Sequence, residues 1–382
     1  MKPNNPFVIS GYRGPEYFCD RIKETSKVVS ALTNERNLTL MAPRRYGKTG
    51  LVRNVFHALS DQYATIYVDI YSTTNLNEFT QAFASAVVGT LDTTVDKALT
   101  AIGRFFRAVR PTVTPDGTGG VSFSFVVEKE ATEATLKGAF DYLASKEQRI
   151  VVAIDEFQQI MGYPEKGTEA LLRSRIQFLE NTNFIFAGSR HHLMGEMFTS
   201  PRHPFYQSTD ILSLDVIAPD SYRAFAERFF REAGRGFSAE VFLALYNRFD
   251  GVTWYVQSVL NRIWGEGGAL ESEKDVALAV ESLVEDRALT FHDLLAAQTE
   301  VGKNLLRAIA SEGKVKELTA GEFLRRHSFV APSSVRTALP SLMEHDLVYR
   351  AADGYMVYDY FFAEYLRRSC AVMAEMREGE MA

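Results

Sequence analysis

Short apolar runs alternate with longer amphipathic segments through the first half of the chain. The runs are rich in β-branched and aromatic residues, which favours strands, and they lie at 38–41, 65–70, 150–154, 184–187 and 211–214. Strands that alternate with helical segments imply a parallel sheet with crossover helices. Nearly every position in the runs is apolar, as expected where both faces of a sheet are covered. The pattern predicts an α/β fold that binds ligands at the carboxyl ends of its strands.

A long insertion separates the second and third predicted strands. It contains an amphipathic stretch at 97–110, then Pro111, Pro115, the glycine-rich run 116–120 and the alternating residues 121–127. We interpret the insertion as a helix, a turn, and a short hairpin or edge strand. A partner-binding element and a plain surface excursion both fit this pattern, and the second is favoured.

The second half of the chain is mostly helical. Between residues 219 and 289 apolar residues recur at helical spacing, which predicts a small helical lid. Three further helical patterns then precede two β-rich runs joined through Asp353-Gly354, a strong hairpin signal. These patterns and runs lie at 304–310, 320–326, 334–343, 347–350 and 355–358. Three helices and a hairpin predict a winged helix-turn-helix, so we expect three domains, at 1–218, 219–289 and 290–382.

A loop ending in glycine, lysine and threonine follows the first predicted strand and precedes a helical pattern. It reads Ala42-Pro43-Arg44-Arg45-Tyr46-Gly47-Lys48-Thr49, with Gly50 next. Strand, loop and helix in this order are what a phosphate-binding loop requires. Gly47 would let successive N–H groups point at phosphate oxygens, Lys48 would reach the β- and γ-phosphates, and Thr49 would place its hydroxyl on Mg²⁺. Ala42 stands where the strict pattern has glycine, and we expect residues 42–50 to bind a nucleotide.

The predicted strand at 150–154 ends in two consecutive carboxylates, Asp155 and Glu156. Asp155 would hold Mg²⁺ through water, and Glu156 would orient and deprotonate the attacking water for in-line transfer of the γ-phosphoryl group. The alternative is that both residues only cap the next helix. Together with the phosphate loop upstream, the pair predicts hydrolysis as well as binding.

The strand at 184–187 is also followed by polar residues. Ser189 would hydrogen-bond the lytic water or the γ-phosphate, and Arg190 would sense phosphate charge. A solvent-exposed turn fits Ser189 equally well and is favoured for Arg190. His191 and His192 come next. Because adjacent histidines point in different directions and no third ligand follows nearby, we expect no metal site there.

The phosphate loop, the Asp155-Glu156 strand and the N-terminal segment Phe18-Cys19-Asp20-Arg21 resemble the prokaryotic AAA-ATPase-like proteins related to the archaeal ATPase and STAND branches of the AAA+ class. The resemblance covers most of the chain. It implies a P-loop NTPase parallel sheet with a helical lid and a C-terminal winged-helix domain. It also implies that the segment before the first strand lies against adenine, which makes Phe7, Val8 and Arg21 candidate contacts of the base.

The resemblance extends to the lid and to the oligomeric state. Gly251 matches the Gly-x-Pro lid motif of the family, whereas Thr253 stands where proline is common. Ring-forming relatives use an arginine in trans, for which Arg190 and Arg202 are the candidates here. The resemblance therefore leaves a homo-oligomer open.

Charge and composition narrow the choice of partners. The formal net charge is −6, and residues 290–382 hold 11 Lys and Arg against 13 Asp and Glu, whereas DNA-binding domains are typically basic. The third helix of the winged-helix region would nevertheless expose Arg336 and Thr337 to a duplex, although Pro340 should kink it. DNA and a second protein both remain open as partners.

Cysteine usage and hydropathy argue against a disulfide-rich, a zinc-binding or a membrane-spanning protein. Cys19 and Cys370 are the two cysteines, far apart, so neither a disulfide framework nor a zinc site is indicated. No stretch approaches the ~18 apolar residues that span a bilayer. We expect a cytoplasmic protein without a membrane partner.

The function expected from these motifs is slow hydrolysis of Mg²⁺-ATP that drives or resets a conformational switch coupled to the winged-helix domain. A remodelling motor would use the same site. The alternative is a DNA-binding regulator or protein-docking module with the nucleotide as a structural or regulatory ligand. The guanine-specific Asn-Lys-x-Asp pattern is absent, which together with the resemblance favours ATP.

Overall fold

The computed structural model describes the chain apart from residues 1–2, 93–94, 107–108, 116–120, 352 and 370–382. Contacts divide it into two units. The first contains residues 1–225 and 252–254, and the second contains residues 226–251 and 255–382. The nucleotide motifs all belong to the first unit.

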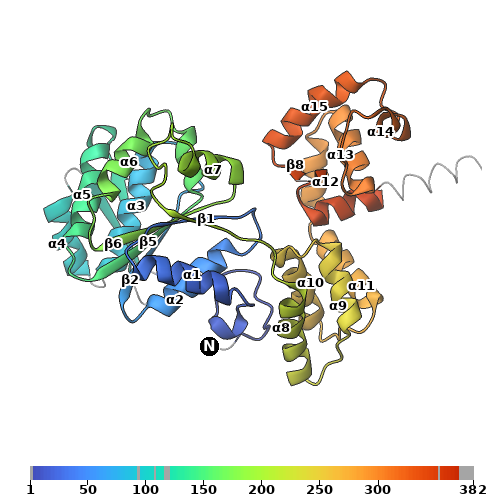
Figure 1. Cartoon of the computed structure of the whole chain (residues 1–382), viewed down its shortest axis with the longest axis horizontal. Helices are drawn as coiled ribbons and strands as arrows, with labels where there is room; N and C mark the ends of the chain where they lie inside the picture. The colour runs from blue at the N-terminus through green and yellow to red at the C-terminus, as the bar shows by residue number, and fades with distance from the viewer. Residues whose placement is uncertain (1–2, 93–94, 107–108, 116–120, 352, 370–382) are drawn as a thin grey trace, which may run out of the picture. The chain divides into compact units, whose positions relative to one another are not determined.

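A five-stranded parallel sheet with the order β2-β5-β6-β1-β7 forms the centre of the first unit (Figure 1). The predicted strands are confirmed, with ends that agree to within two residues. Their bounds are Leu38–Met41 for β1, Tyr63–Asp69 for β2, Arg149–Asp155 for β5, Thr182–Gly188 for β6 and Asp210–Ser213 for β7. Because β5, β6 and β1 are neighbours, the residues that follow these three strands meet at one edge of the sheet.

Helices cover both faces of this sheet (Figure 1). One face packs against α1 (Ile22–Thr33) and α2 (Lys48–Leu59). The other packs against α3 (Leu76–Leu91), α5 (Thr132–Ala144), α6 (Thr168–Ile176) and α7 (His191–Thr199). Alternate residues of β5 join opposite cores, since Val151 and Ala153 face α2 while Val152 and Ile154 face the other layer. Burial on both sides accounts for the continuous apolar runs in the sequence.

The insertion after α3 is a helix followed by a hairpin. Helix α4 covers Val95–Phe105, and β3 (Val109–Pro115) pairs antiparallel with β4 (Val121–Val127). The helix predicted over 97–110 is wrong at its end, because Val109 and Arg110 pair with β4. Phe106 stacks on Phe125, with 5.7 Å between ring centroids, and β4 packs along α3. The glycine-rich run 116–120 lies outside the described residues.

The second unit is largely helical and ends in the predicted helix-and-hairpin pattern, which is confirmed. Its elements are α8 (Pro219–Glu232, which begins in the first unit), α9 (Ala239–Arg248), α10 (Thr253–Gly265), α11 (Glu273–Glu285), α12 (Ala288–Ala296), α13 (Glu300–Glu312), α14 (Gly321–Arg326), α15 (Pro332–Glu344), β8 (Val348–Ala351) and β9 (Gly354–Val357). Gly354 has φ 151°, and a Cβ there would lie 2.7 Å from the carbonyl oxygen of Val315. The β8–β9 hairpin therefore needs glycine at this position.

The lid helices and the winged-helix region pack together inside the second unit. The rings of Tyr255 and Phe361 are 5.2 Å apart, and Arg248 forms an ion pair with Glu364 at 2.9 Å. Residues 360–369 are helical and supply these contacts. The domain boundary placed at residue 289 stays a prediction, because both parts belong to one compact unit.

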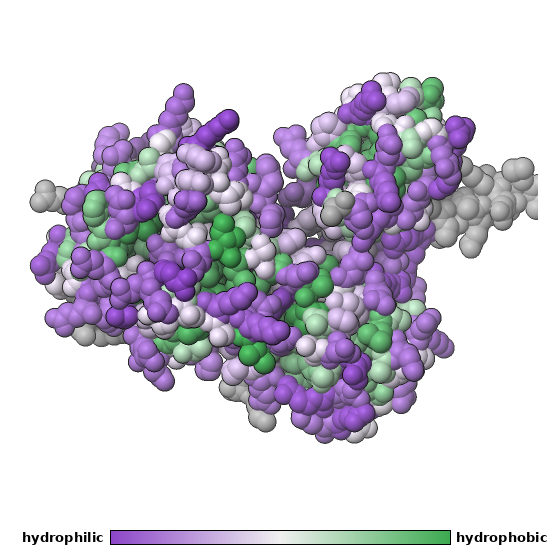
Figure 2. All heavy atoms as spheres, in the orientation of Figure 1, coloured by the Kyte–Doolittle hydropathy of each residue, from purple (hydrophilic) through white to green (hydrophobic). Residues whose placement is uncertain are grey.

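Hydrophilic residues cover most of the face drawn in Figure 2, with apolar residues scattered among them. In the part of the chain that the structure describes, no helix combines the length and the apolar character needed to cross a bilayer. Cys19 is buried in the first unit.

Candidate functional site

The phosphate loop turns directly from β1 into α2. Gly47 (φ 90°) and Arg45 (φ 72°) adopt left-handed backbone conformations, which glycine does without strain. Gly47 is the N-cap of α2 and has no side chain to cap the helix. Because the first amides of a helix lack intrahelical acceptors and carry the positive end of its dipole, the loop presents N–H groups to an anion. Ala42, in place of glycine, is fully buried and donates its N–H to the carbonyl oxygen of Gly188 at 3.3 Å.

Glu156 lies among residues from all three central strand ends. The Nζ atom of Lys48 is 3.8 Å from its Oε1 atom. Its Oε2 atom accepts hydrogen bonds from Ser189 Oγ and from Gln158 Nε2, both at 2.6 Å. Glu156 has φ 58°, an uncommon conformation for a residue with a side chain. The fold thus brings together Lys48, Glu156 and Ser189, although 108 residues separate the first two in the sequence and 33 separate the last two.

The surroundings of Glu156 favour its ionised form. Burial acts to raise the pKa of this carboxyl, but Lys48, the hydrogen bonds from Ser189 and Gln158, and the charge of Arg44 outweigh burial and lower the pKa below its ordinary value. The side chain is therefore a carboxylate at neutral pH. That is the form in which it can accept a proton from water.

Asp155 and Thr49 form a second cluster of oxygen atoms beside the loop. Thr49 Oγ1 donates to Asp155 Oδ2 at 3.0 Å, and the hydroxyl of Tyr67 donates to the same oxygen. Asp155 Oδ1 accepts the backbone N–H of Glu156 at 3.0 Å. A carboxylate and a hydroxyl are the hard oxygen ligands that Mg²⁺ prefers, so the residues predicted to hold Mg²⁺ are adjacent and of the right chemistry.

The other residues of the loop contact aromatic rings and backbone. The guanidinium of Arg44 lies 5.4 Å from the ring centroid of Tyr71, and that of Arg45 lies 4.6 Å from that of Trp254. The N–H of Trp254 donates to the carbonyl oxygen of Arg45 at 3.1 Å. Trp254 therefore contacts the loop through both its ring and its backbone.

The candidate adenine contacts lie in different surroundings. Phe7 is fully buried, with its ring edge 6.3 Å from the ring of Phe225, and Val8 is half-buried. Arg21 is buried and donates to the carbonyl oxygens of Tyr46 and Asp215. Arg21 is thus tied to the phosphate loop, and contact of these residues with adenine stays a prediction.

The candidate arginines for action in trans, Arg190 and Arg202, are both exposed, and their role also stays a prediction.

Gly251 has φ 69°, and a Cβ there would lie 2.4 Å from the ring of Tyr246. Thr253 follows at the start of α10. The glycine of the lid motif is therefore required by backbone and space, whereas proline is not.

The sequence did not single out Gln158 and Tyr67. Gln158 is 4% exposed, and its Oε1 atom has no hydrogen-bond partner among the described residues. A polar residue in the apolar segment after Glu156 was the available signal. Tyr67 gave no such signal, because an aromatic residue is ordinary in a strand.

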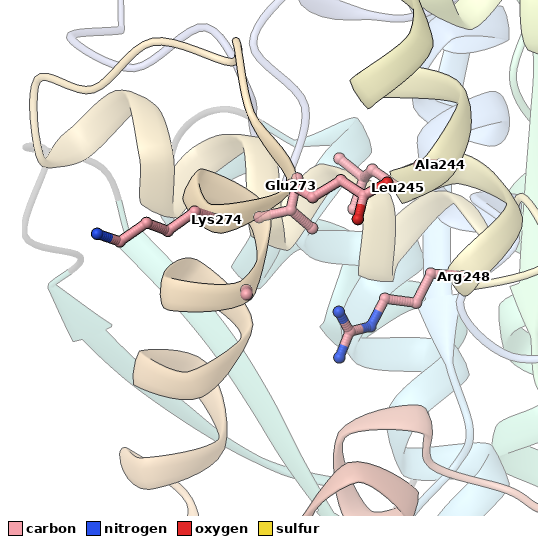
Figure 3. Close-up of a pocket in the computed structure, with 7 residues that line it drawn as sticks. Ala244, Leu245, Arg248, Glu273 and Lys274 are labelled. Atoms are coloured by element: carbon pink, nitrogen blue, oxygen red, sulfur yellow. The ribbon is translucent and has the colours of Figure 1, made fainter.

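A hollow of about 460 Å³ in the second unit contains none of these residues (Figure 3). Arg248 reaches into it from α9, while Glu273 and Lys274 stand at the start of α11, with Lys274 directed away from Arg248. Arg248 is paired with Glu364. The residues that line the hollow, at 244–248 and 273–277, are therefore distinct from the phosphate loop at 42–50.

Three solved structures illustrate the fold that this chain shares with known proteins. The Walker-type ATPase PABY2304 of Pyrococcus abyssi has a TM-score of 0.63 at 17% identity, covering 95% of this chain and 99% of that one. The ORC1 protein of Aeropyrum pernix in complex with DNA has a TM-score of 0.54 at 16% identity, with 98% and 100% covered. The ADP form of Aeropyrum pernix ORC2 has a TM-score of 0.52 at 16% identity, with 99% and 98% covered. No curated protein matches the chain.

Two family models match the chain. One, described as a probable winged helix domain, matches residues 289–368 and confirms the winged-helix prediction. The other, described as an ATPase domain predominantly from Archaea, matches residues 18–259. This match spans more than half of the chain and includes every residue of the candidate nucleotide site except Phe7 and Val8. The chain therefore belongs to the family of ATPase domains found predominantly in Archaea.

Proposed function

We propose that residues 42–50 bind the phosphates of Mg²⁺-ATP and that Glu156 is the base for its hydrolysis. The observation that carries the proposal is the convergence of Lys48, Glu156 and Ser189 beside a helix N-terminus. Lys48 is 7% exposed and Glu156 is 14% exposed at the side chain, so both act where water screens charge weakly.

In this proposal each residue has one role. The amides at the start of α2 and the Lys48 ammonium bind the β- and γ-phosphates. The carboxylate of Glu156 accepts a proton from the water that attacks the γ-phosphorus, the bond to the β,γ-bridging oxygen breaks, and ADP leaves with that oxygen. Ser189 keeps the carboxylate oriented or hydrogen-bonds the water. Lys48 neutralises charge on the transferring group.

Thr49 and Asp155 are the residues that would hold Mg²⁺, and their adjacent oxygen atoms fit that ion. When bound, Mg²⁺ would neutralise charge on the β- and γ-phosphate oxygens. In the described residues no group of three or more His, Cys, Asp or Glu side chains could hold a metal. A site with few protein ligands is what Mg²⁺ shared with nucleotide phosphates requires.

Hydrolysis is proposed to reset a switch that includes helix α10. Trp254, in the first turn of α10, belongs to the first unit and contacts Arg45, whereas α10 from Tyr255 onward belongs to the second. Because Arg45 lies in the phosphate loop, a change of the loop on nucleotide binding would act on the start of α10. This contact supports coupling between the nucleotide and the second unit.

A second protein is the partner that charge favours for the winged-helix region. Residues 290–382 carry more acidic than basic side chains, and phosphate contacts dominate DNA affinity. DNA is the second candidate, since Arg336 and Thr337 are exposed on α15 and the Aeropyrum pernix ORC1 protein of the same fold was solved in complex with DNA.

Nucleotide binding and phosphate release with Mg²⁺-ATP test the proposal in the wild type, Lys48→Ala and Glu156→Gln, with and without duplex DNA. We expect Lys48→Ala to lose binding, and Glu156→Gln to keep binding while hydrolysis falls about 100-fold or more. Lys274→Ala, at an exposed lysine of α11, is the matched control. Wild-type binding in Lys48→Ala, or no nucleotide binding by the wild type, would overturn the proposal. Stimulation by DNA would promote the DNA candidate.

A further inference from the structure

Tyr67 occupies a place in β2 from which its side chain reaches the carboxylate of Asp155. The two strands pair in parallel, with Tyr67 opposite Ala153 and Asp69 opposite Asp155. Tyr67 packs against the core shared by α1, α2 and this face of the sheet. Its hydroxyl donates to Asp155 Oδ2, the same oxygen that accepts from Thr49.

A cation–π contact holds the ring that carries this hydroxyl. The guanidinium of Arg53, from α2, lies 4.2 Å from the centroid of the Tyr67 ring and covers one of its faces. The ring is thus held against α2 while its hydroxyl donates to Asp155 Oδ2.

We propose that Tyr67 is a positioning residue that holds the Asp155 carboxylate in the orientation required to bind Mg²⁺. This inference rests on the proposed function, in which Thr49 and Asp155 hold the metal. Asp155 Oδ1 is already fixed by the N–H of Glu156. With Tyr67 on Oδ2, both oxygens have a donor that stays in place when the hydroxyl of Thr49 turns to the metal. Such outer partners of a metal ligand typically contribute about 10- to 100-fold to metal affinity.

The test uses the full chain and a fluorescent ATP analogue, whose binding is followed as Mg²⁺ is titrated in an EDTA buffer. Tyr67→Phe removes the hydroxyl and keeps the ring. We expect the Mg²⁺ concentration for half-maximal binding to rise about tenfold, while affinity without Mg²⁺ and thermal stability stay near the wild type. Tyr63→Phe is the matched control, because its hydroxyl, on the same strand, accepts from Arg149 at 3.4 Å instead.

Asp155→Asn separates the two ways in which the inference can fail. If Asp155→Asn raises the Mg²⁺ requirement and Tyr67→Phe does not, the positioning role of Tyr67 is overturned and the metal site stands. If neither variant changes the Mg²⁺ requirement although the analogue binds, the proposed metal site is overturned together with the role of Tyr67. An equal shift in Tyr63→Phe would also overturn the inference, because loss of any hydroxyl from β2 would then have the same effect.

Discussion

Replacing Gln158 by methionine should separate hydrolysis from stability. Gln158 Nε2 donates to Glu156 Oε2 at 2.6 Å, and its Oε1 atom is buried without a partner among the described residues. Methionine has a similar length and no polar hydrogen. Gln158→Met therefore removes one donor from the base and also removes a buried acceptor that has no donor.

Loss of the donor and removal of the unpaired acceptor change the free energy of unfolding in opposite directions, and the size of each change can be given. A hydrogen bond to a charged group contributes about 1.5–3 kcal/mol. If that stabilisation orients the base, its loss lowers the rate of the hydrolysis step about 10- to 100-fold. An unpaired buried polar atom is unfavourable by about 1–3 kcal/mol. Its removal offsets the stability lost with the hydrogen bond, so the variant should unfold within roughly 2 kcal/mol of the wild type. ATP binding should change little, since Gln158 contacts the base and not the phosphate loop.

The assay is single-turnover hydrolysis of ATP with binding and thermal unfolding measured on the same preparations. Gln159→Met is the matched control, because the Gln159 side chain donates to the carbonyl oxygen of Tyr71 at 2.7 Å and not to Glu156. Ser189→Ala combined with Gln158→Met should be non-additive, since both residues donate to the same oxygen. A hydrolysis rate within twofold of the wild type, or a loss of stability greater than roughly 2 kcal/mol, would refute the reasoning.

Two further predictions follow from Glu156 and from Gly188. The pKa of Glu156 is lowered from the ordinary glutamate value of 4.5. Protonation of Glu156 should therefore slow hydrolysis only below pH 4.5, and this residue should cause no change in rate at higher pH. Ser189→Ala removes a hydrogen bond to the carboxylate and should move the acid limb of a pH–rate profile upward; an unmoved or lowered limb would contradict this. Gly188→Ala would place a Cβ 2.4 Å from Gln158 Oε1 and should lower the free energy of unfolding by about 1–3 kcal/mol in a urea titration. The control is Gly89→Ala on α3, where nothing lies within 4 Å and a gain of roughly 0.5–1 kcal/mol is expected; equal effects of the two substitutions would argue against the packing at Gly188.

The sequence predicts the fold well where burial imposes a pattern. Strands covered on both faces are continuously apolar, so all five strands of the sheet were visible. The insertion was predicted less well, because an amphipathic pattern near Arg110 fits a helix end and a strand start equally. Its pairing with Val126 decides for the strand. Pairing between segments is a property of the fold that local periodicity does not contain.

The residues of the candidate site also differ in how well the sequence predicts them. Lys48, Asp155 and Ser189 follow strands that are neighbours in the sheet, so the rule that ligands bind at carboxyl ends of parallel strands was enough to group them. Gln158 and Tyr67 act through another side chain. Their roles depend on where their hydrogens point, and a strand or helix pattern does not specify this direction.

The two carboxylates of the site receive their outer hydrogen bonds from different elements. Glu156 is held by Ser189 after β6 and by Gln158 in the turn after β5, whereas Asp155 is held by Tyr67 from β2. Because adjacent carboxylates at the end of one strand repel each other, separate donors keep the two side chains pointing in different directions. This division predicts that substitutions around Glu156 alter the hydrolysis rate, while substitution of Tyr67 alters the Mg²⁺ requirement. Variants that shifted both quantities together would mean that the two carboxylates form one coupled unit.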